Sequence, residues 1–189
     1  KIKGFKVEEA TVFSPELAAK YPQIKSYKGT SVTNPNQQIR FSVSPDGVQS
    51  MMVDKNSEQS TFMQKTADGS AYVVYARNGL DLVDKQFICE TEDAISSSIL
   101  APQPSLVHTQ VLKKYRVAIS ATGEYTQYHG GTVVNALAAI NATLTRINMV
   151  FETDLAVTLE LVSNTDLVIY SDATSDPYSG NLNAQAQGV

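Results

Sequence analysis

The fold is decided by the stretch Thr132-Val-Val-Asn-Ala-Leu-Ala-Ala-Ile-Asn-Ala-Thr-Leu-Thr-Arg-Ile-Asn-Met-Val-Phe151. Its apolar residues recur every three or four positions, which is the period that gives a helix one apolar face. That predicted stripe consists of Val133, Leu137, Ile140, Leu144, Ile147 and Val150. The short apolar runs before and after the helix, Tyr115–Ala121 and Leu155–Val162, predict buried strands. The strand–helix–strand order predicts a parallel strand pair with a right-handed crossover. A short strand over Leu167–Tyr170 and a polar loop are expected to follow.

The first half of the chain has a different pattern. A short helix is predicted to start at Ser14-Pro15, because Ser caps free N–H groups and Pro fits the first helical position, and to end by Pro22. Alternating segments separated by Asp-Gly turns then predict two β-hairpins. The hairpins comprise Gln38–Ser44 with Val48–Val53, and Thr61–Thr66 with Ala71–Ala76. A further strand over Lys85–Cys89 would complete an antiparallel meander.

The two patterns are separated by residues 93–104, which are rich in Ser and Pro and lack periodicity, as interdomain linkers do. We therefore expect an α+β protein with a boundary near residue 105. Residues 1–105 form the antiparallel β-meander with one short helix, and residues 106–189 form an incomplete α/β unit. The last residues have the pattern of the first turn of another helix, so we expect the second unit to be truncated.

Composition limits the possible functions. The 189 residues carry a formal net charge of −4, which offers no basic field for nucleic acid or for an anionic membrane. The only cysteine is Cys89, so an intrachain disulfide framework and a four-cysteine zinc site are excluded. We also expect no membrane span, because no uninterrupted apolar run has the required length. The N-terminal residues lack the apolar stretch of a signal peptide.

A family resemblance rests on four stretches of the second half: Lys114–Tyr125, which contains Ala121-Thr-Gly-Glu-Tyr125, then Gln127–Gly131, Val134–Asn148 and Val150–Leu155. Together they resemble the start of the catalytic domain in bacterial reprolysin-like (adamalysin-type) zinc metalloendopeptidases of the metzincin clan. The likeness covers residues 112–183. It implies a metzincin-like strand, long helix and strand, with the Ala-Thr-Gly-Glu-Tyr stretch closing the first strand. It also implies that residues 1–105 are a pro-region.

The resemblance further implies hydrolysis of peptide bonds in proteins or peptides by zinc-activated water. Such enzymes hold zinc on a His-Glu-x-x-His-x-x-Gly-x-x-His helix. This chain contains only His108 and His129 and no His-Glu pair. We therefore assign no catalytic residue and expect the isolated chain to be inactive, with the C-terminal catalytic portion missing. The family likeness also implies a secreted protein whose signal peptide has been removed.

Four positions are candidates for binding a metal. Cys89 is a possible zinc ligand that keeps the zymogen latent; the alternative is a small buried hydrophobic residue on a strand. Glu124, at the end of the first predicted strand, is a possible structural calcium ligand or a hydrogen-bonded structural carboxylate. His129 is interpreted as a loop residue. The loop with Asp172, Ser175 and Asp176 has a calcium-like composition, but a solvated turn is the preferred interpretation.

The sequence allows two alternatives to a metallopeptidase precursor. The first is a noncatalytic exported module, in which the β-rich part binds a partner protein. The second is phosphate or nucleotide binding by the strand–helix unit. Gly123 and Gly130-Gly131 do not form a Gly-x-Gly-x-x-Gly sequence, so we discount the second.

Overall fold

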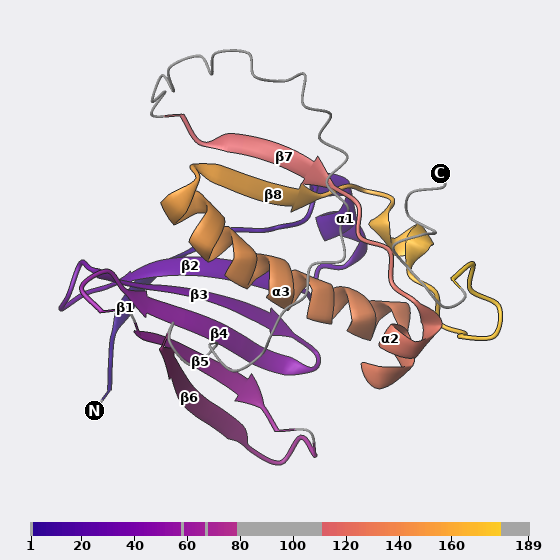
Figure 1. Cartoon of the computed structure of the whole chain (residues 1–189), viewed down its shortest axis with the longest axis horizontal. Helices are drawn as coiled ribbons and strands as arrows, with labels where there is room; N and C mark the ends of the chain where they lie inside the picture. Colours follow the sequence, from indigo (N-terminus) through magenta and orange to yellow (C-terminus); the bar gives the residue numbers. More distant parts are fainter. Residues whose placement is uncertain (1, 58, 67, 79–110, 179–189) are drawn as a thin grey trace, which may run out of the picture.

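The computed structural model describes residues 2–57, 59–66, 68–78 and 111–178. Figure 1 shows the long helix α3 (Val133–Asp154) lying between a six-stranded antiparallel sheet and a two-stranded parallel sheet. This arrangement confirms the predicted α+β class and the antiparallel β-meander. The predicted strand Lys85–Cys89 and the boundary near residue 105 lie outside the described residues.

The six-stranded sheet follows the order of its strands in the sequence, and every neighbouring pair is antiparallel. Its strands are β1 (Phe5–Glu9), β2 (Lys25–Ser31), β3 (Gln37–Ser44), β4 (Gly47–Asp54), β5 (Gln59–Lys65) and β6 (Tyr72–Asn78). Both predicted hairpins are therefore confirmed. The turn between β3 and β4 needs Gly47, whose φ of 118° is a left-handed value that favours glycine. The sequence analysis did not predict β1 and β2.

Helix α1 (Pro15–Lys20) confirms the prediction made from Ser14-Pro15. The Ser14 hydroxyl accepts a hydrogen bond from the Leu17 N–H at 3.3 Å, and Pro15 occupies the first helical position. The helix ends at Tyr21, next to Pro22, which lacks the N–H that a longer helix would need.

The second half of the chain contains β7 (Lys113–Val117), α2 (Gly123–Tyr128), α3 and β8 (Val157–Leu161). Strands β7 and β8 pair in parallel, as predicted, but β7 is mostly exposed, so its prediction as a buried strand is wrong. The predicted strand over Leu167–Tyr170 is wrong. A 3-10 helix, η2 (Thr165–Val168), occupies its first half, because the Thr165 hydroxyl bonds back to Val162 O at 2.9 Å and supports a turn. Of the predicted strand, a single parallel bridge between Ala121 and Ile169 remains.

Helix α3 is buried on more than the predicted stripe, because a sheet covers it on each side. Its buried residues include Asn141, Thr145 and Asn148 beside the apolar ones. Val150 was predicted to be in the core but is 41% exposed. The buried positions of the last turns are shifted to Asn148 and Met149, so this part of the predicted stripe is wrong.

Helix α3 also has the length and composition of a membrane-spanning helix. Buried core helices meet the same two criteria, and α3 lies between the two sheets with most of this apolar stretch buried. Length and composition therefore do not assign it to a membrane, and the expected lack of a membrane span stays a prediction.

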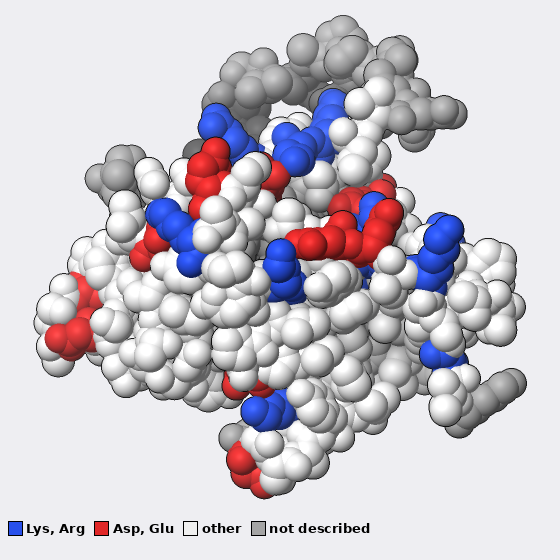
Figure 2. All heavy atoms as spheres, turned by 180° about the vertical axis from the view of Figure 1, so that it is seen from behind, with Lys and Arg blue, Asp and Glu red and all other residues white. Residues whose placement is uncertain are grey.

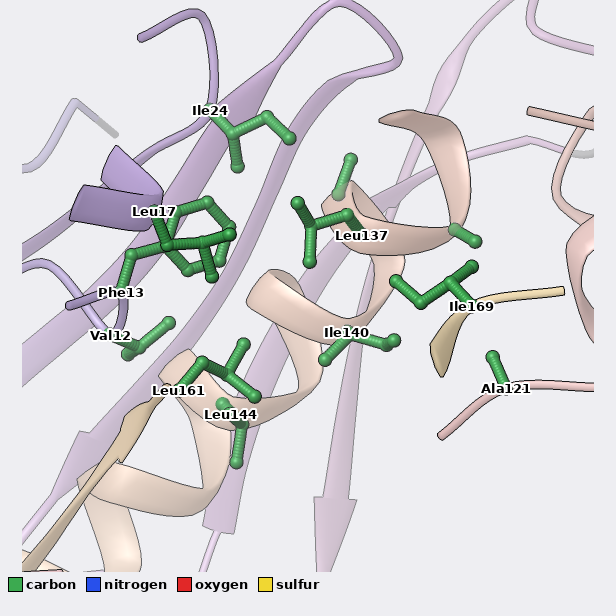
Figure 3. Close-up of a cluster of buried hydrophobic side chains, with 12 residues drawn as sticks. Val12, Phe13, Leu17, Ile24, Ala121, Leu137, Ile140, Leu144, Leu161 and Ile169 are labelled. Carbon is green, nitrogen blue, oxygen red and sulfur yellow. The ribbon is translucent and has the colours of Figure 1, made fainter. Parts of the chain in front are cut away.

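One hydrophobic core uses residues from both halves of the sequence. Figure 3 shows Val12, Phe13, Leu17 and Ile24 from the first half beside α3 side chains, Leu161 and Ile169 from the second. The described residues on the two sides of the linker thus pack together. The division into two domains at residue 105 stays a prediction.

The contact between α3 and the six-stranded sheet is more polar. The Ser26 hydroxyl donates to Asn141 Oδ1 at 2.9 Å, and the Thr145 hydroxyl donates to Ser26 Oγ at 2.9 Å. Further along the helix, Arg40 forms an ion pair with Glu152. Hydrogen bonds and charges therefore fix the position of α3 on this sheet.

Candidate functional site

The motif Ala121-Thr-Gly-Glu-Tyr125 lies where β7 gives way to helix. Strand β7 ends at Val117, four residues before the motif. The Thr122 hydroxyl accepts from the Tyr125 N–H at 3.3 Å and caps α2, which starts at Gly123. The expectation that this motif closes the first strand is therefore wrong, because its threonine and the following glycine start a helix instead.

Gly123 is buried against the loop formed by residues 172–176. A Cβ at this position would lie 2.1 Å from Ala173 N and 2.3 Å from the Asp172 carbonyl carbon. The Gly123 N–H donates to Asp176 Oδ2 at 2.7 Å, which places a carboxylate at the first turn of α2. The motif thus needs glycine because two backbone segments meet there.

We predict that Gly123→Ala lowers the free energy of unfolding by about 1–3 kcal/mol, the usual cost of forcing extra atoms into a packed site. The loop would have to move away and the bond to Asp176 would lengthen. Urea unfolding followed by circular dichroism measures the effect. The control is Gly4→Ala, where the added Cβ would meet only the Val32 side chain at 3.1 Å. Equal stability of the two variants would contradict the packing argument.

An apolar cavity of about 320 Å³ opens beside this motif. Its lining residues come from the segment after β7, from α2 and from α3: Ile119, Ser120, Ala121, Thr122, Tyr125, Ile140 and Thr143. The Ser120 hydroxyl donates to Val168 O at 2.8 Å, and Tyr178 OH donates to Ser120 Oγ at 2.5 Å. Burial raises the pKa of Tyr125. Without a charged lining group, this cavity is suited to holding an apolar side chain.

A wider, polar groove of about 620 Å³ lies between strands β1–β3 and the C-terminal turns of α3. Its charged residues include Lys28, which pairs with Glu8 at 3.2 Å, and Arg40, which pairs with Glu152. Figure 2, a view from behind, shows basic and acidic residues lying next to one another on the surface that it draws. Two further lysines line the groove, so its four positive and two negative charges leave it net basic.

The candidate metal ligands are not brought together among the described residues. Cys89 and His108 lie outside them. Glu124 is in the first turn of α2 and exposed, so its placement at the end of a strand is wrong, and its role as a calcium ligand stays a prediction. In the part of the chain that the structure describes, no group of three His, Cys, Asp or Glu side chains could hold a metal ion.

The loop with Asp172, Ser175 and Asp176 uses its carboxylates as hydrogen-bond acceptors. Asp172 Oδ1 accepts from the Thr174 N–H at 2.8 Å, and this bond and its neighbours lower the pKa of Asp172. Asp176 accepts from Gly123 and, at 2.8 Å, from the Tyr178 N–H. These contacts account for the acidic residues as parts of a turn that supports α2.

His129 ends α2 and lies against two aromatic rings, with ring centroids 4.5 Å from Tyr125 and 5.0 Å from Tyr128. Burial lowers its pKa below the ordinary value of 6.5, although the charge of Asp46 acts in the opposite direction. The imidazole is therefore a packed helix-end residue that resists protonation.

This shift predicts a pH dependence. A lowered pKa means that the unfolded chain binds the proton more readily, so the contribution of His129 to stability is present above its unfolded pKa of about 6.5 and is lost as the pH falls through the folded pKa. Wild type should therefore lose more stability than His129→Gln between about pH 7.5 and pH 5. Urea unfolding of both proteins at the two pH values tests this, since His108 is present in both. Parallel losses would show that His129 is not responsible.

The comparison with known families agrees with this part of the structure. Residues 111–189 match the profile of the metallo-peptidase family M12B, Reprolysin-like. The match begins just before β7 and includes the Ala-Thr-Gly-Glu-Tyr motif, α3 and β8. No curated protein and no solved structure matched the chain.

The Reprolysin-like match over residues 111–189 supports the predicted likeness of the second half of the chain to metallopeptidases. Its bacterial, adamalysin-type assignment and the pro-region stay predictions. Sequence reasoning missed α2 and the apolar cavity. Thr122 at the N-cap, followed by Glu124 in the first turn, is a helix-start signal that could have revealed α2.

Proposed function

We propose that this chain is the N-terminal part of a precursor of a secreted zinc-dependent endopeptidase, in which residues 1–105 are the pro-region. The Reprolysin-like match over residues 111–189 carries the proposal. A family of metallopeptidases supports peptide-bond hydrolysis, with proteins or peptides as substrates.

The described residues do not fit a zinc site, because no three ligand side chains meet among them. In this proposal the zinc ligands belong to a catalytic portion outside the 189 residues, and calcium remains a possible second ion. We accordingly derive no catalytic step from the residues of this chain. Their proposed role is to build the first strands and the long helix of the enzyme.

The shared core supports a pro-region that assists folding. Val12, Phe13 and Leu17 are fully buried in the same cluster as Leu137, Leu144 and Leu161. Without residues 1–24, this apolar surface of α3 and β8 would face water. A segment that covers it while the enzyme folds acts as an intramolecular scaffold.

The test is to sequence the gene beyond the codon of Val189 and to express the longer protein. We expect a His-Glu-x-x-His helix downstream and cleavage of casein that zinc supports and a chelator stops. A longer reading frame without this helix would instead favour a noncatalytic module that binds a partner protein. The outward face of the meander, where Val7 and Val74 are exposed, would then be the first surface to mutate.

Latency is the second part of the proposal. If the Cys89 thiolate occupies the open zinc position, Cys89→Ser in the longer precursor should show protease activity before processing, whereas wild type should not. The measurement is casein cleavage by each unprocessed precursor. Equal latency of the two proteins would assign Cys89 a packing role.

A further inference from the structure

The outer edge of β8 pairs with an extended segment from the first half of the chain. Leu161 N–H donates to Val12 O at 2.7 Å, and Ser14 N–H donates to Leu161 O at 2.9 Å. With these two bonds Phe13 pairs in parallel with Leu161. The segment therefore joins the β7–β8 pair on the side opposite β7, as a peptide does in β-strand addition.

The neighbouring position on this edge is already occupied by α3. Asn148 Nδ2 donates to Leu159 O at 2.9 Å, and the Leu159 N–H donates to Asn148 Oδ1 at 2.9 Å. The side chain thus satisfies the backbone of Leu159, and the added segment satisfies that of Leu161. The two together complete the hydrogen bonds of this edge at both positions.

Apolar side chains fix the added segment in place. Val12, Phe13 and Leu17 are 0% exposed. In Figure 3 they lie beside Leu144, Leu161 and other side chains of the core cluster. Burial of these three side chains makes the largest favourable contribution to the free energy with which a segment of this length can bind.

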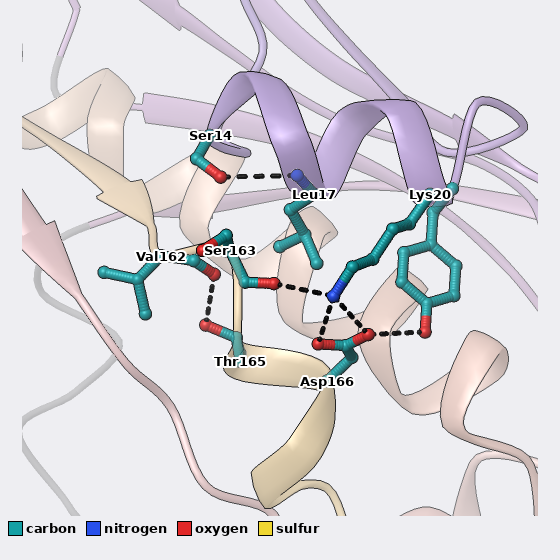
Figure 4. Close-up of polar contacts among 8 residues, drawn as sticks. Ser14, Leu17, Lys20, Val162, Ser163, Thr165 and Asp166 are labelled. Carbon is teal, nitrogen blue, oxygen red and sulfur yellow. Dashed lines mark hydrogen bonds and ion pairs between the residues drawn. The ribbon is translucent and has the colours of Figure 1, made fainter.

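A polar contact fixes the other end of α1, as Figure 4 shows. Lys20 Nζ donates to Asp166 at 3.1 Å and 3.2 Å and to Ser163 O at 3.1 Å, and Tyr21 OH donates to Asp166 Oδ2 at 3.1 Å. The Asp166 side chain is only 11% exposed, so the carboxylate is held close to both partners. Residues 11–21, here named the N-terminal clasp, are thus held at both ends.

The other contact between the two halves is weaker in kind. The α3 face against the meander meets Ser26, Arg40 and other polar groups. Asn141 Nδ2 and Arg146 Nε are buried there without a hydrogen-bond partner among the described residues. Unpaired buried polar atoms reduce the strength of an interface. By contrast, the apolar side chains Val12, Phe13 and Leu17 of the N-terminal clasp are fully buried.

We propose that the outer edge of β8, together with Asp166, is a docking site for the N-terminal clasp. The site binds an extended Val-Phe pair and the helix that follows it, which Ser-Pro begins and Lys-Tyr ends. The N-terminal clasp occupies it and keeps the first half of the protein bound after the chain between residues 78 and 111 is cut. This inference rests on the proposed function for its biological meaning. Processing of the precursor would then give a two-piece complex, and release of the pro-region would need a separate step.

The experiment uses the full chain with the recognition sequence of a specific protease inserted between Ser98 and Ile99. After complete cleavage, size-exclusion chromatography should show the two fragments in one peak. Two separate peaks for the wild-type sequence would overturn the proposal. The readout needs no peptidase activity, so it stays valid if the search for a zinc-binding helix fails.

Variants assign the binding to the clasp. Phe13→Ala should weaken fragment association at least about tenfold, a change of about 1.4 kcal/mol in binding free energy. Lys20→Ala should weaken it by a smaller factor, because the Lys20 side chain is 44% exposed although its partner Asp166 is only 11% exposed. The control is Lys25→Ala on β2. It removes an exposed ion pair with Glu9 of β1 and should leave the single peak unchanged. Circular dichroism before cleavage verifies that each variant is folded. If Phe13→Ala is unfolded, the test uses Lys20→Ala, because the Lys20 side chain is half-exposed and its loss should not unfold the protein. Undiminished association in the folded clasp variants would show that the meander holds the halves together and would overturn the proposal.

Discussion

Replacing Asn148 with leucine is expected to lower the free energy of unfolding by about 2–6 kcal/mol, because two backbone groups lose their partners at a cost of about 1–3 kcal/mol each. Asn148 is 2% exposed, and its amide bonds both the N–H and the C=O of Leu159. Leucine fills a similar volume but offers neither a donor nor an acceptor. Urea unfolding monitored by circular dichroism measures the loss.

The matched control is Val150→Ala, two residues along the same helix. Its side chain is exposed, so the unfolding free energy should change by no more than about 0.5 kcal/mol. Asn148→Asp adds a second comparison, since it keeps an acceptor for the Leu159 N–H but buries a charge beside Leu159 O. If Asn148→Leu unfolds at the wild-type urea concentration, water must satisfy both backbone groups of Leu159.

The sequence was most informative where local chemistry decides the structure. Ser14-Pro15 predicted the start of α1, and the Asp-Gly turns predicted both hairpins. The helical period predicted α3, although the stripe is wrong at Val150 because a second sheet covers the helix and changes which face is buried. Patterns within one element cannot show how many neighbours will cover it.

Elements that depend on tertiary contacts were missed. Strand β1 reads Phe-Lys-Val-Glu-Glu and is mostly exposed, so it lacks the buried alternation that marks a strand. Its pairing with β2 provides the order that its own residues do not predict. The prediction of a strand over Leu167–Tyr170 failed for the opposite reason. Its apolar residues suggest a strand, but the hydroxyl of Thr165, just before it, supports a 3-10 turn.

The same limit applies to the candidate site. The motif residues of the second half lie within the Reprolysin-like match, but the cavity beside them needs side chains from three separate segments. The position of Gly123 against residues 172–176 could not be predicted either, because two backbone segments about fifty residues apart in the sequence meet there. The spacing of residues within a motif does not show which distant segment of the backbone will contact it.

The second large effect is expected for Glu152→Leu, which should lower the free energy of unfolding by about 3–5 kcal/mol, as breaking a buried ion pair on one side usually does. The Arg40 side chain is 5% exposed, whereas that of Glu152 is 23% exposed. Removing Glu152 therefore leaves a guanidinium with little access to water. Arg40→Met leaves the better hydrated carboxylate and should cost less. Urea unfolding of both single variants gives the order.

The double variant Arg40→Met/Glu152→Leu separates the pair from its surroundings. Because neither charge is then buried, and because apolar replacements of buried ion pairs are often neutral or stabilising, we expect it to be more stable than Glu152→Leu and close to wild type. Such a recovery would mean that this ion pair fixes where α3 lies on the meander without adding much net stability. A double variant as unstable as Glu152→Leu would instead show that the charges themselves hold the two halves together, and the polar interface would then have a larger share in binding than the N-terminal clasp.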